Sequence, residues 1–344
     1  MSRAAVRCLD RAPPGWEALL SADPDATPAH RPEVWAALCE TLGMSLTFVA
    51  VESQGALLGG AAALIERRAG LAWIHALPFL LSGAPLARTE ARSQVDLAVG
   101  EMLGRLQVGL GAIGGEWVLY RPAEAALESR ALDPVAGESR MLDTMLIDLT
   151  AGLDSARRRL DRETRHELRL AGARGLRFAE EAQALEEAYA LHLAQARGWG
   201  NFRPLPIELS RRLLSASGPG ECPPARLFTV RDGHGLVSAM LALDHPRETF
   251  AWWSGTRPSG RARHAGLFLL WSATEWASER GRDRMNLGGS AGRLSLAAFK
   301  RSLGARRVRF PVRWLDSRSA PWPGRALARL QRRLRRGRFR GESM

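Results

Sequence analysis

The stretches 248-ETFAWWSG-255, 267-LFLLWSATEWASERG-281 and 283-DRMNLGG-289 decide the fold class of this sequence. The first is rich in aromatic residues, which is typical of a strand. In the second, apolar residues recur at helical spacing and Gly281 follows the last turn, so we expect a helix over 266–280 that packs against a sheet. A strand, a helix and another strand in succession indicate an α/β protein.

The elements predicted on either side of this core repeat its pattern. We expect helices over 31–43, 90–111, 154–173, 183–197, 206–216 and 294–302, and strands over 46–53, 56–68, 71–77, 116–121, 143–150, 175–181, 226–232, 236–245 and 306–315. Each half thus contains a meander of strands, a long helix and a further strand, which predicts an α/β sheet built twice. We place the first domain at 1–142, the second at 143–318 and a basic tail at 319–344.

Length and composition agree with two globular domains. The chain has 344 residues, of which 46% are hydrophobic and 25% charged, and this excludes disordered and fibrous classes. The formal net charge is +13, but 48 of the 49 basic residues are Arg and only Lys300 is Lys. Such a bias is typical of a GC-rich coding background, so the charge is weak evidence for a nucleic-acid partner.

Cysteine usage and hydropathy predict a cytoplasmic protein. Cys8, Cys39 and Cys222 are far apart in sequence and form neither a metal-binding pattern nor a disulfide framework. The first twenty residues lack the apolar region of a signal peptide. The most apolar stretch, 71–87, is interrupted by His, Pro and Gly and is too short to cross a bilayer. We expect no metal site, and no P-loop, Rossmann or G-x-S-x-G motif is present.

Four segments of the second half carry recognisable motifs: 160-LDRETRHELRLAGARGLRF-178, 191-LHLAQARGWG-200, 285-MNLGGSAG-292 and 299-FKRSLG-304. Together they resemble the C-terminal half of the Fem-type aminoacyl transferases, and equally their relatives, the BioF2-like or GNAT-type acetyltransferases. The resemblance extends over about 143–315 and is only architectural over 30–140. It implies tandem GNAT-like (acyl-CoA N-acyltransferase) domains with mixed, mainly antiparallel sheets flanked by helices.

Lys300 is the candidate catalytic residue. It occupies the F-K-x-x-x-G position of the resemblance in a chain that otherwise uses Arg for every basic side chain. A compact ammonium group can approach a developing oxyanion or a phosphate as a point charge, which a planar guanidinium does less well. The resemblance implies a Lys that holds the acceptor or stabilises the tetrahedral intermediate of acyl transfer. The alternative is a surface Lys without a function.

The candidate substrate-binding residues nearest in sequence are Asn286, Gly288, Gly289 and Ser290. Glycines at a strand end let a ligand approach the backbone closely, so main-chain N–H groups there could receive a carbonyl or a phosphate. Asn286 is one of only two Asn in the chain. A plain turn is the alternative.

Other candidate substrate-binding residues are Arg165, Arg197, Trp252 and Trp253. Arg165 belongs to the set Arg158, Arg162, Arg165 and Arg169, which would share one face of a helix over 154–173 and could bind phosphates. Arg197 matches a basic residue that the Fem-like pattern places by the acceptor pocket. Trp252 and Trp253 are adjacent on a strand, so we expect one in the core and one facing a groove. A solvated face, a helix-terminal cation and ordinary core packing are the alternatives.

One segment departs from the acetyl-CoA pattern of the superfamily. Acetyl-CoA enzymes carry Q/R-x-x-G-x-G/A before the central helix, so that bare amides bind the pyrophosphate. Here the segment is 261-RARHAG-266, and His264 stands where a glycine is expected. The departure argues against ordinary coenzyme A binding in the second domain.

These observations predict a transferase that moves an aminoacyl group from aminoacyl-tRNA to an amine of a cell-envelope precursor or a peptide, with no bound cofactor. The acceptor would be nucleotide- or lipid-linked. One alternative is an acetyl- or acyl-CoA-dependent N-acyltransferase, and a second is a non-catalytic module that binds RNA or membrane. The segment 323–344 carries eight Arg and one Glu, and could lie on an anionic membrane or bind RNA.

Overall fold

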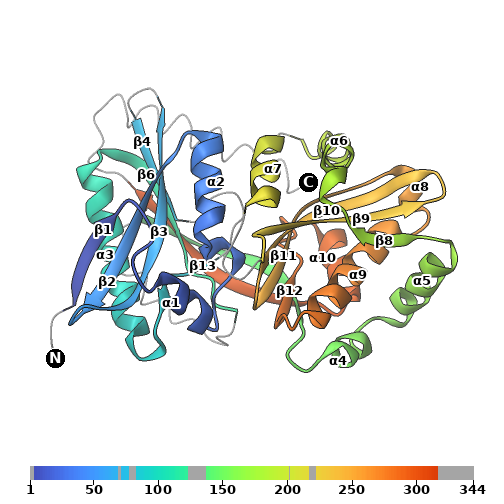
Figure 1. Ribbon diagram of the computed structural model, residues 1–344, viewed down its shortest axis with the longest axis horizontal. Helices are drawn as coiled ribbons and strands as arrows, with labels where there is room; N and C mark the ends of the chain where they lie inside the picture. Colours follow the sequence, from blue (N-terminus) through green and yellow to red (C-terminus); the bar gives the residue numbers. More distant parts are fainter. Residues whose placement is uncertain are drawn as a thin grey trace. The chain divides into compact units, whose positions relative to one another are not determined.

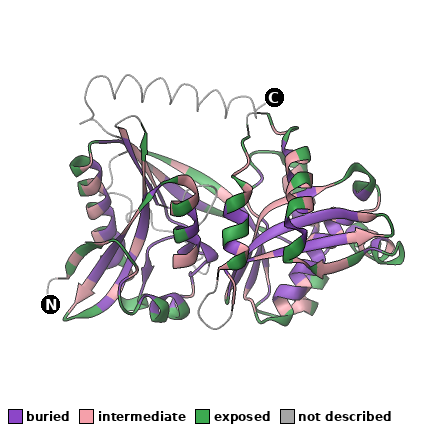
Figure 2. Cartoon of the chain, turned by 45° about the horizontal axis from the view of Figure 1, so that its top comes forward, coloured by how far each residue is buried: buried purple, intermediate pink, exposed green. Residues whose placement is uncertain are grey.

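The computed structural model describes residues 4–68, 71–76, 83–122, 137–200, 202–216 and 222–316. The chain divides into two compact units, one of residues 1–142 together with those from 309 onward, and one of residues 143–308. Each unit contains a sheet with helices on its faces (Figure 1). Buried residues follow the strands, and the helices turn their exposed residues outward (Figure 2).

The first unit is built around a sheet ordered β1-β2-β3-β4-β6-β13. Its elements are β1 (Ala5–Leu9), α1 (Trp16–Ala22), α2 (Pro32–Leu42), β2 (Ser45–Ser53), β3 (Ala56–Arg68), β4 (Leu71–Ala76), β5 (Leu86–Ala87), α3 (Arg92–Gly109), β6 (Ala112–Val118) and β13 (Arg306–Asp316). Neighbouring strands are antiparallel except β4 and β6. Residues 309–316, which we predicted to belong to the second domain, instead group with this unit, because Val312 of β13 pairs with Val118 of β6.

Helices cover both faces of this sheet. Val49 and Val51 of β2 share a buried cluster with Val95 and Val99 of α3. Phe48, which precedes Val49, points to the opposite face, because successive side chains of a strand alternate. There its ring lies 5.2 Å from that of Trp16 and 5.1 Å from that of Trp35, in α1 and α2. β1 and α1 lie in the polar, Pro-rich beginning of the chain, for which we had predicted no regular element.

The second unit carries the candidate site. Its elements are β7 (Gly137–Asp148, which enters the unit at residue 143), α4 (Leu153–Arg158), α5 (Arg162–Ala173), β8 (Arg177–Glu180), α6 (Leu185–Ala196), α7 (Ile207–Ser215), β9 (Ala225–Asp232), β10 (Gly235–His245), β11 (Glu248–Thr256), α8 (Pro258–Arg261), α9 (Ala265–Glu279), β12 (Arg284–Asn286) and α10 (Leu294–Ser302). The strand order is β8-β9-β10-β11-β12-β7.

Strand pairing in the two units follows the same scheme. Three antiparallel pairs are followed by one parallel pair, β4 with β6 in the first unit and β11 with β12 in the second, and then by an antiparallel last strand. The antiparallel last strand is β13 in the first unit and β7 in the second. The prediction of an α/β sheet built twice is therefore confirmed.

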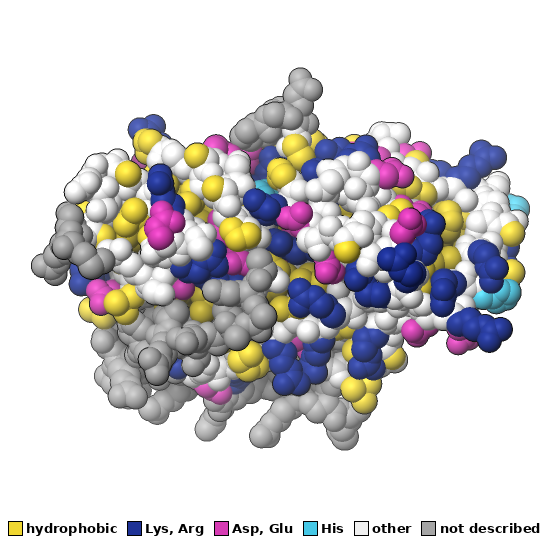
Figure 3. Space-filling view, turned by 90° about the horizontal axis from the view of Figure 1, so that it is seen from below, with side chains coloured by type: hydrophobic (Ala, Val, Ile, Leu, Met, Phe, Trp, Pro, Cys, Tyr) yellow, Lys and Arg dark blue, Asp and Glu magenta, His cyan; other side chains and the backbone are white. Residues whose placement is uncertain are grey.

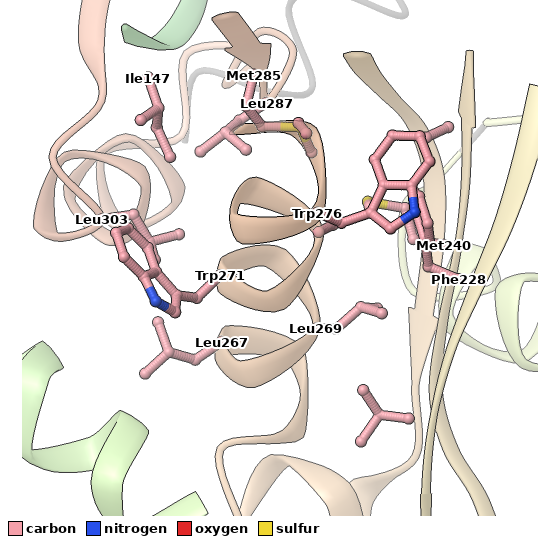
Figure 4. Close-up of a cluster of buried hydrophobic side chains, with 14 of the residues drawn as sticks. Ile147, Phe228, Met240, Leu267, Leu269, Trp271, Trp276, Met285, Leu287 and Leu303 are labelled. Carbon is pink, nitrogen blue, oxygen red and sulfur yellow. The ribbon is translucent and has the colours of Figure 1, made fainter. Parts of the chain in front are cut away.

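Helix α9 forms the core of the second unit, as its apolar pattern predicts. Trp271 and Trp276 leave α9 in different directions, and both are buried (Figure 4). The ring of Trp276 lies 4.9 Å from that of Phe228 in β9. Trp271 belongs to the same buried cluster, with Leu267 and Leu303 beside it in the close-up. The two Trp residues are thus packing residues.

The single helix predicted over 154–173 is wrong, because the chain forms α4 and α5 with a break at 159–161. Leu160 is buried in the core at the break, and the backbone N–H of Asp161 donates to the carbonyl of Ser302 at 3.0 Å. Asp161 is the N-cap residue of α5 and has an extended backbone conformation, so the helix starts anew after it. Arg158 consequently belongs to α4 and does not share the face that Arg162, Arg165 and Arg169 form on α5.

Candidate active site

The ammonium group of Lys300 lies inside the second unit, on the turn that follows β12. Lys300 is in the last turn of α10 and is only 7% exposed. Its Nζ donates to the carbonyl oxygens of Gly288 at 3.1 Å and Gly289 at 2.7 Å. The surface-lysine alternative is therefore wrong, and Lys300 is in contact with two of the predicted substrate-binding residues.

Burial changes the ionisation of this lysine. Loss of solvent lowers the pKa of Lys300 from 10.5 to about 8, although the negative charge of Asp143 opposes this change. The Asp143 carboxylate itself forms an ion pair with Arg307. Lys300 is thus a cation at neutral pH and loses its charge at mildly alkaline pH.

Asn286 holds the start of the turn. It is 1% exposed, and its Oδ1 accepts from the Thr144 hydroxyl at 2.6 Å and from the backbone N–H of Gly288 at 2.9 Å. Strand β7 supplies Thr144, and the Met145 backbone N–H also donates to the Gly288 carbonyl at 3.1 Å. Sequence reasoning identified Asn286 but missed Thr144, because a Thr in a strand carries no distinguishing signal.

Both glycines of the turn are required by its geometry. Gly288 has a φ of +75°, in the left-handed region that favours glycine. Gly289 has an ordinary φ, but a Cβ there would lie 2.8 Å from the carbonyl oxygen of Asp143. The group that closely approaches Gly289 is the backbone of β7, and close approach of a ligand to these glycines stays a prediction.

Ser290 and the adjacent amides supply hydrogen-bonding groups without partners in the described part of the chain. Ser290 is 5% exposed, and its buried Oγ has no partner there. The backbone N–H groups of Gly289 and Ser290 likewise donate to no described residue. Buried polar groups are nearly always paired in folded proteins. An unpaired hydroxyl beside two free amides and a cation suits a polar or anionic group of a ligand.

The tryptophans lie on β11, the strand next to β12. Trp253 stacks on His192 of α6 with ring centroids 5.0 Å apart, and its Nε1 donates to Ser210 Oγ at 3.2 Å. It therefore packs under α6 and α7 rather than facing the turn. Trp252 is half-buried and falls in a bulge, since Leu241 pairs with Trp253 and Ala242 pairs with Ala251. The bulge interrupts the strict alternation on which our expectation for the pair rested.

The two predicted arginines lie on the surface of other elements. Arg165 is exposed on α5, and Arg197 is exposed at the end of α6. No acidic side chain in the described residues pairs with either of them. The structure thus brings together Lys300, Asn286, Gly288, Gly289 and Ser290, whereas Arg165, Arg197 and Trp253 form no hydrogen bond or ion pair with them among the described residues.

His264 adopts a left-handed backbone conformation, which favours glycine. Its φ is +62°, and it precedes the first turn of α9. Its Nδ1 lies 3.5 Å from Glu167 Oε1 of α5. An imidazole and a Cβ therefore stand at the entrance to the helix N-terminus, as the sequence predicted.

Comparison with known proteins identifies the second unit. Residues 154–301 match the family model described as an acetyltransferase (GNAT) domain. The second unit is a GNAT domain. The match classes the chain as an acyltransferase, and the predicted tandem GNAT fold is confirmed.

Solved structures share this fold along most of the chain. A structure described as FemX has a TM-score of 0.69 at 13% identity and covers 89% of this chain and 96% of its own. The C-terminal domain of a putative lysylphosphatidylglycerol synthetase from Agrobacterium fabrum has a TM-score of 0.55 at 15% identity, over 91% and 93% of the two chains. A tandem GNAT protein from the clavulanic acid biosynthesis pathway has a TM-score of 0.53 at 12% identity, and the match covers 93% of this chain and 100% of that one. No curated protein matches the sequence.

The described residues hold no group of three or more His, Cys, Asp or Glu side chains arranged to bind a metal ion. None of the described helices is long and apolar enough to cross a membrane.

Proposed function

We propose that the chain forms an amide by passing an aminoacyl group from aminoacyl-tRNA to the amine of a cell-envelope precursor or a peptide. The observation that carries this proposal is the Lys300 ammonium bound to the 288–289 turn beside the unpaired hydroxyl of Ser290. The sequence resemblance to the Fem-type aminoacyl transferases and the shared fold with FemX support it.

The reaction needs positioning and charge stabilisation more than a covalent catalyst. The acceptor nitrogen attacks the ester carbonyl carbon, a C–N bond forms, and the ester C–O bond to the ribose breaks. The amine loses one proton, and the departing ribose oxygen gains one. Since the donor is already an activated ester, holding both substrates in line supplies much of the acceleration. Negative charge develops on the carbonyl oxygen and requires donors near it.

Lys300 would serve this reaction in two ways. An ammonium has three N–H donors, and two of them hold the carbonyls of Gly288 and Gly289. These bonds fix the turn so that the amides of Gly289 and Ser290 keep their direction. The remaining donor and the positive charge would stabilise the oxyanion of the tetrahedral intermediate.

The exposed arginines of α5 and the position of His264 favour a tRNA donor. Arg162, Arg165 and Arg169 project from α5 within about 60° of one another by helical geometry, and each is exposed without an acidic partner among the described residues. Figure 3 shows many Lys and Arg side chains on one face of the molecule. Arginines of this kind bind phosphates of a nucleic-acid backbone. His264 stands where the coenzyme A pattern has a glycine, which argues against a pyrophosphate bound at the N-terminus of α9.

An acyl-CoA-dependent N-acyltransferase is the second candidate, favoured by the GNAT model over 154–301. Calorimetry with acetyl-CoA separates the two candidates. Micromolar binding would favour acyl-CoA as donor, and absence of heat together with product formed from charged tRNA would favour aminoacyl transfer.

The proposal for Lys300 is tested by the pH dependence of product formation. Lys300→Met should lower kcat by about 10²–10³, the cost of losing one stabilising donor. In the wild type kcat should fall as pH rises through about 8, because the cation is lost there. Lys300→Arg keeps its charge at all these pH values, so whatever activity it retains should lack this decline. Mass spectrometry of the product is the measurement, and equal activity of Lys300→Met and wild type would overturn the proposal.

We further propose that the acceptor is lipid-linked and that the basic segment 323–344 binds an anionic membrane. This segment lies outside the described residues. Deleting 323–344 should abolish binding to anionic vesicles while leaving tRNA binding unchanged. Undiminished vesicle binding by the truncated chain would discard this part of the proposal.

A further inference from the structure

Glu248 is a buried carboxylate that neither the sequence analysis nor the proposed reaction uses. It opens β11 and is only 1% exposed. Its Oε2 accepts from Arg284 Nε at 2.7 Å, and its Oε1 accepts from Asn286 Nδ2 at 2.9 Å. Arg284 and Asn286 are two residues apart on β12, so they lie on one face of the parallel β11–β12 pair. One carboxylate thus bridges both ends of that short strand.

This bridge decides which way the Asn286 amide points. A carboxylate can only accept hydrogen bonds, so it must face the NH₂ group of Asn286. The amide oxygen is then turned toward the Thr144 hydroxyl and the Gly288 N–H, at 2.6 and 2.9 Å. With the amide reversed, its NH₂ would face the N–H donor of Gly288 and a buried hydrogen bond would be lost.

The series of hydrogen bonds continues through Gly288 to Lys300. Gly288 donates its N–H to the Asn286 oxygen, and its carbonyl accepts from the Lys300 ammonium. The hydrogen bonds therefore run without interruption from Arg284 through Glu248, Asn286 and Gly288 to Lys300. All four charged or amide side chains of this series are buried.

We infer that Glu248 is a positioning residue of the acyl-transfer site, which fixes the orientation of Asn286 and thereby the turn that Lys300 occupies. This inference rests on the proposed function for its catalytic meaning, whereas the structural link that it describes can be tested separately.

The sharpest test exchanges the carboxylate of Glu248 and the amide of Asn286. Glu248→Gln must present its oxygen to Arg284 and hence its NH₂ to Asn286, which reverses the Asn286 amide. Asn286→Asp places two carboxylates against each other. The double variant Glu248→Gln/Asn286→Asp restores one donor between the two side chains and leaves a carboxylate oxygen for Thr144 and Gly288. Its net charge equals that of the wild type.

Lys300 supplies a readout that a general loss of stability would not reproduce. It is the only lysine of the chain, so isotope-labelled lysine gives one side-chain signal by NMR, whose Cε shift follows the ionisation of Nζ. In the wild type the titration midpoint should lie near 8. Each single variant should raise the titration midpoint of Lys300 by at least one pH unit, because the turn opens to water. The double variant should bring the midpoint back to the wild-type value.

A matched control removes another Glu–Arg pair in the same unit. Glu180 accepts from Arg226 Nη1 at 2.7 Å, and Glu180→Gln should leave the Lys300 titration unchanged. Where a single variant does not fold, Thr144→Val removes a donor to Asn286 without burying a new charge, and Thr144→Ser restores the hydroxyl. Midpoints that stay at the wild-type value in the single variants or in Thr144→Val would overturn the inference, as would a double variant that behaves like the single ones.

Activity separates this inference from the proposed function. With a donor and an acceptor that give product, the single variants should lower kcat by at least tenfold with a smaller effect on KM, and the double variant should recover to within about threefold. If the wild type forms no product from charged tRNA or acyl-CoA, the proposed function fails, while the titration still decides the link between Glu248 and Lys300.

Discussion

In the first unit, His75 of β4 lies between carboxylates of the two neighbouring strands. Its Nδ1 is 3.2 Å from Glu116 of β6, and its Nε2 is 3.0 Å from Glu66 of β3. Burial by itself would lower the pKa of His75, but hydrogen bonds and charge from both carboxylates raise it to about 9. A protonated imidazole donates from both nitrogens. His75 is therefore a buried cation in a cluster with two half-buried carboxylates, of which Glu66 also pairs with Arg68.

This cluster predicts a loss of stability in alkali. Because the folded-state pKa exceeds the unfolded value of 6.5, the contribution of His75 is complete below about pH 6.5 and is lost as pH rises through 9. Denaturant unfolding should show His75→Gln less stable than wild type by up to about 3 kcal/mol at pH 6, with a smaller difference at pH 9.5. The exposed His234→Gln serves as the control. A difference that is the same at both pH values would contradict the prediction.

Among single residues, the site residues that the sequence made recognisable were those of residue types rare in this chain. Lys300 and Asn286 stand out because this chain almost never uses Lys or Asn, and the structure brings the two to one turn. Glu248 and Thr144 belong to common residue types, and their contribution depends on pairing across strands far apart in sequence. Sequence reasoning could not find them, since strand register is decided by tertiary packing.

The turn after β12 leaves too little space beside its backbone for a side chain at Gly289. Gly289→Ala would place a methyl group 2.8 Å from the carbonyl oxygen of Asp143, so β7 or the turn must shift. We expect a loss of about 1–3 kcal/mol in the free energy of unfolding, with loss of activity. Gly172→Ala, at an exposed position of α5 with nothing within 4 Å of the added Cβ, should instead stabilise the fold by about 0.5–1 kcal/mol. Denaturant unfolding of both variants checks this, and a Gly289→Ala chain as stable as wild type would refute it.

Elements with a strong apolar pattern were predicted well, and the misses have particular causes. Helix α9 and strands β9 to β11 follow their sequence patterns closely, because most of their residues are buried. The break between α4 and α5 was missed, because it depends on the Asp161 backbone bonding to Ser302, more than a hundred residues away. β1 was missed since it is a mostly exposed strand that pairs on one side with β2.

For the whole molecule, a tRNA donor predicts a particular salt dependence. Each phosphate contact adds about 0.7–0.9 to the slope of log K against log salt. Replacing Arg162, Arg165 and Arg169 by Gln should therefore weaken tRNA binding and reduce the slope by about 2–3. Fluorescence anisotropy over a salt series is the measurement. The control replaces the exposed Arg11, Arg67 and Arg105 of the first unit, and an equal effect of both triple variants would argue against a site on α5.

Strand β13 has a consequence for how the chain is made. The sheet of the first unit gains its last strand from residues that follow the entire second unit. A ribosome that has finished residue 142 has not yet translated β13, so β6 has only β4 beside it until the GNAT domain has been synthesised. Protein synthesis therefore completes the first unit only after the second.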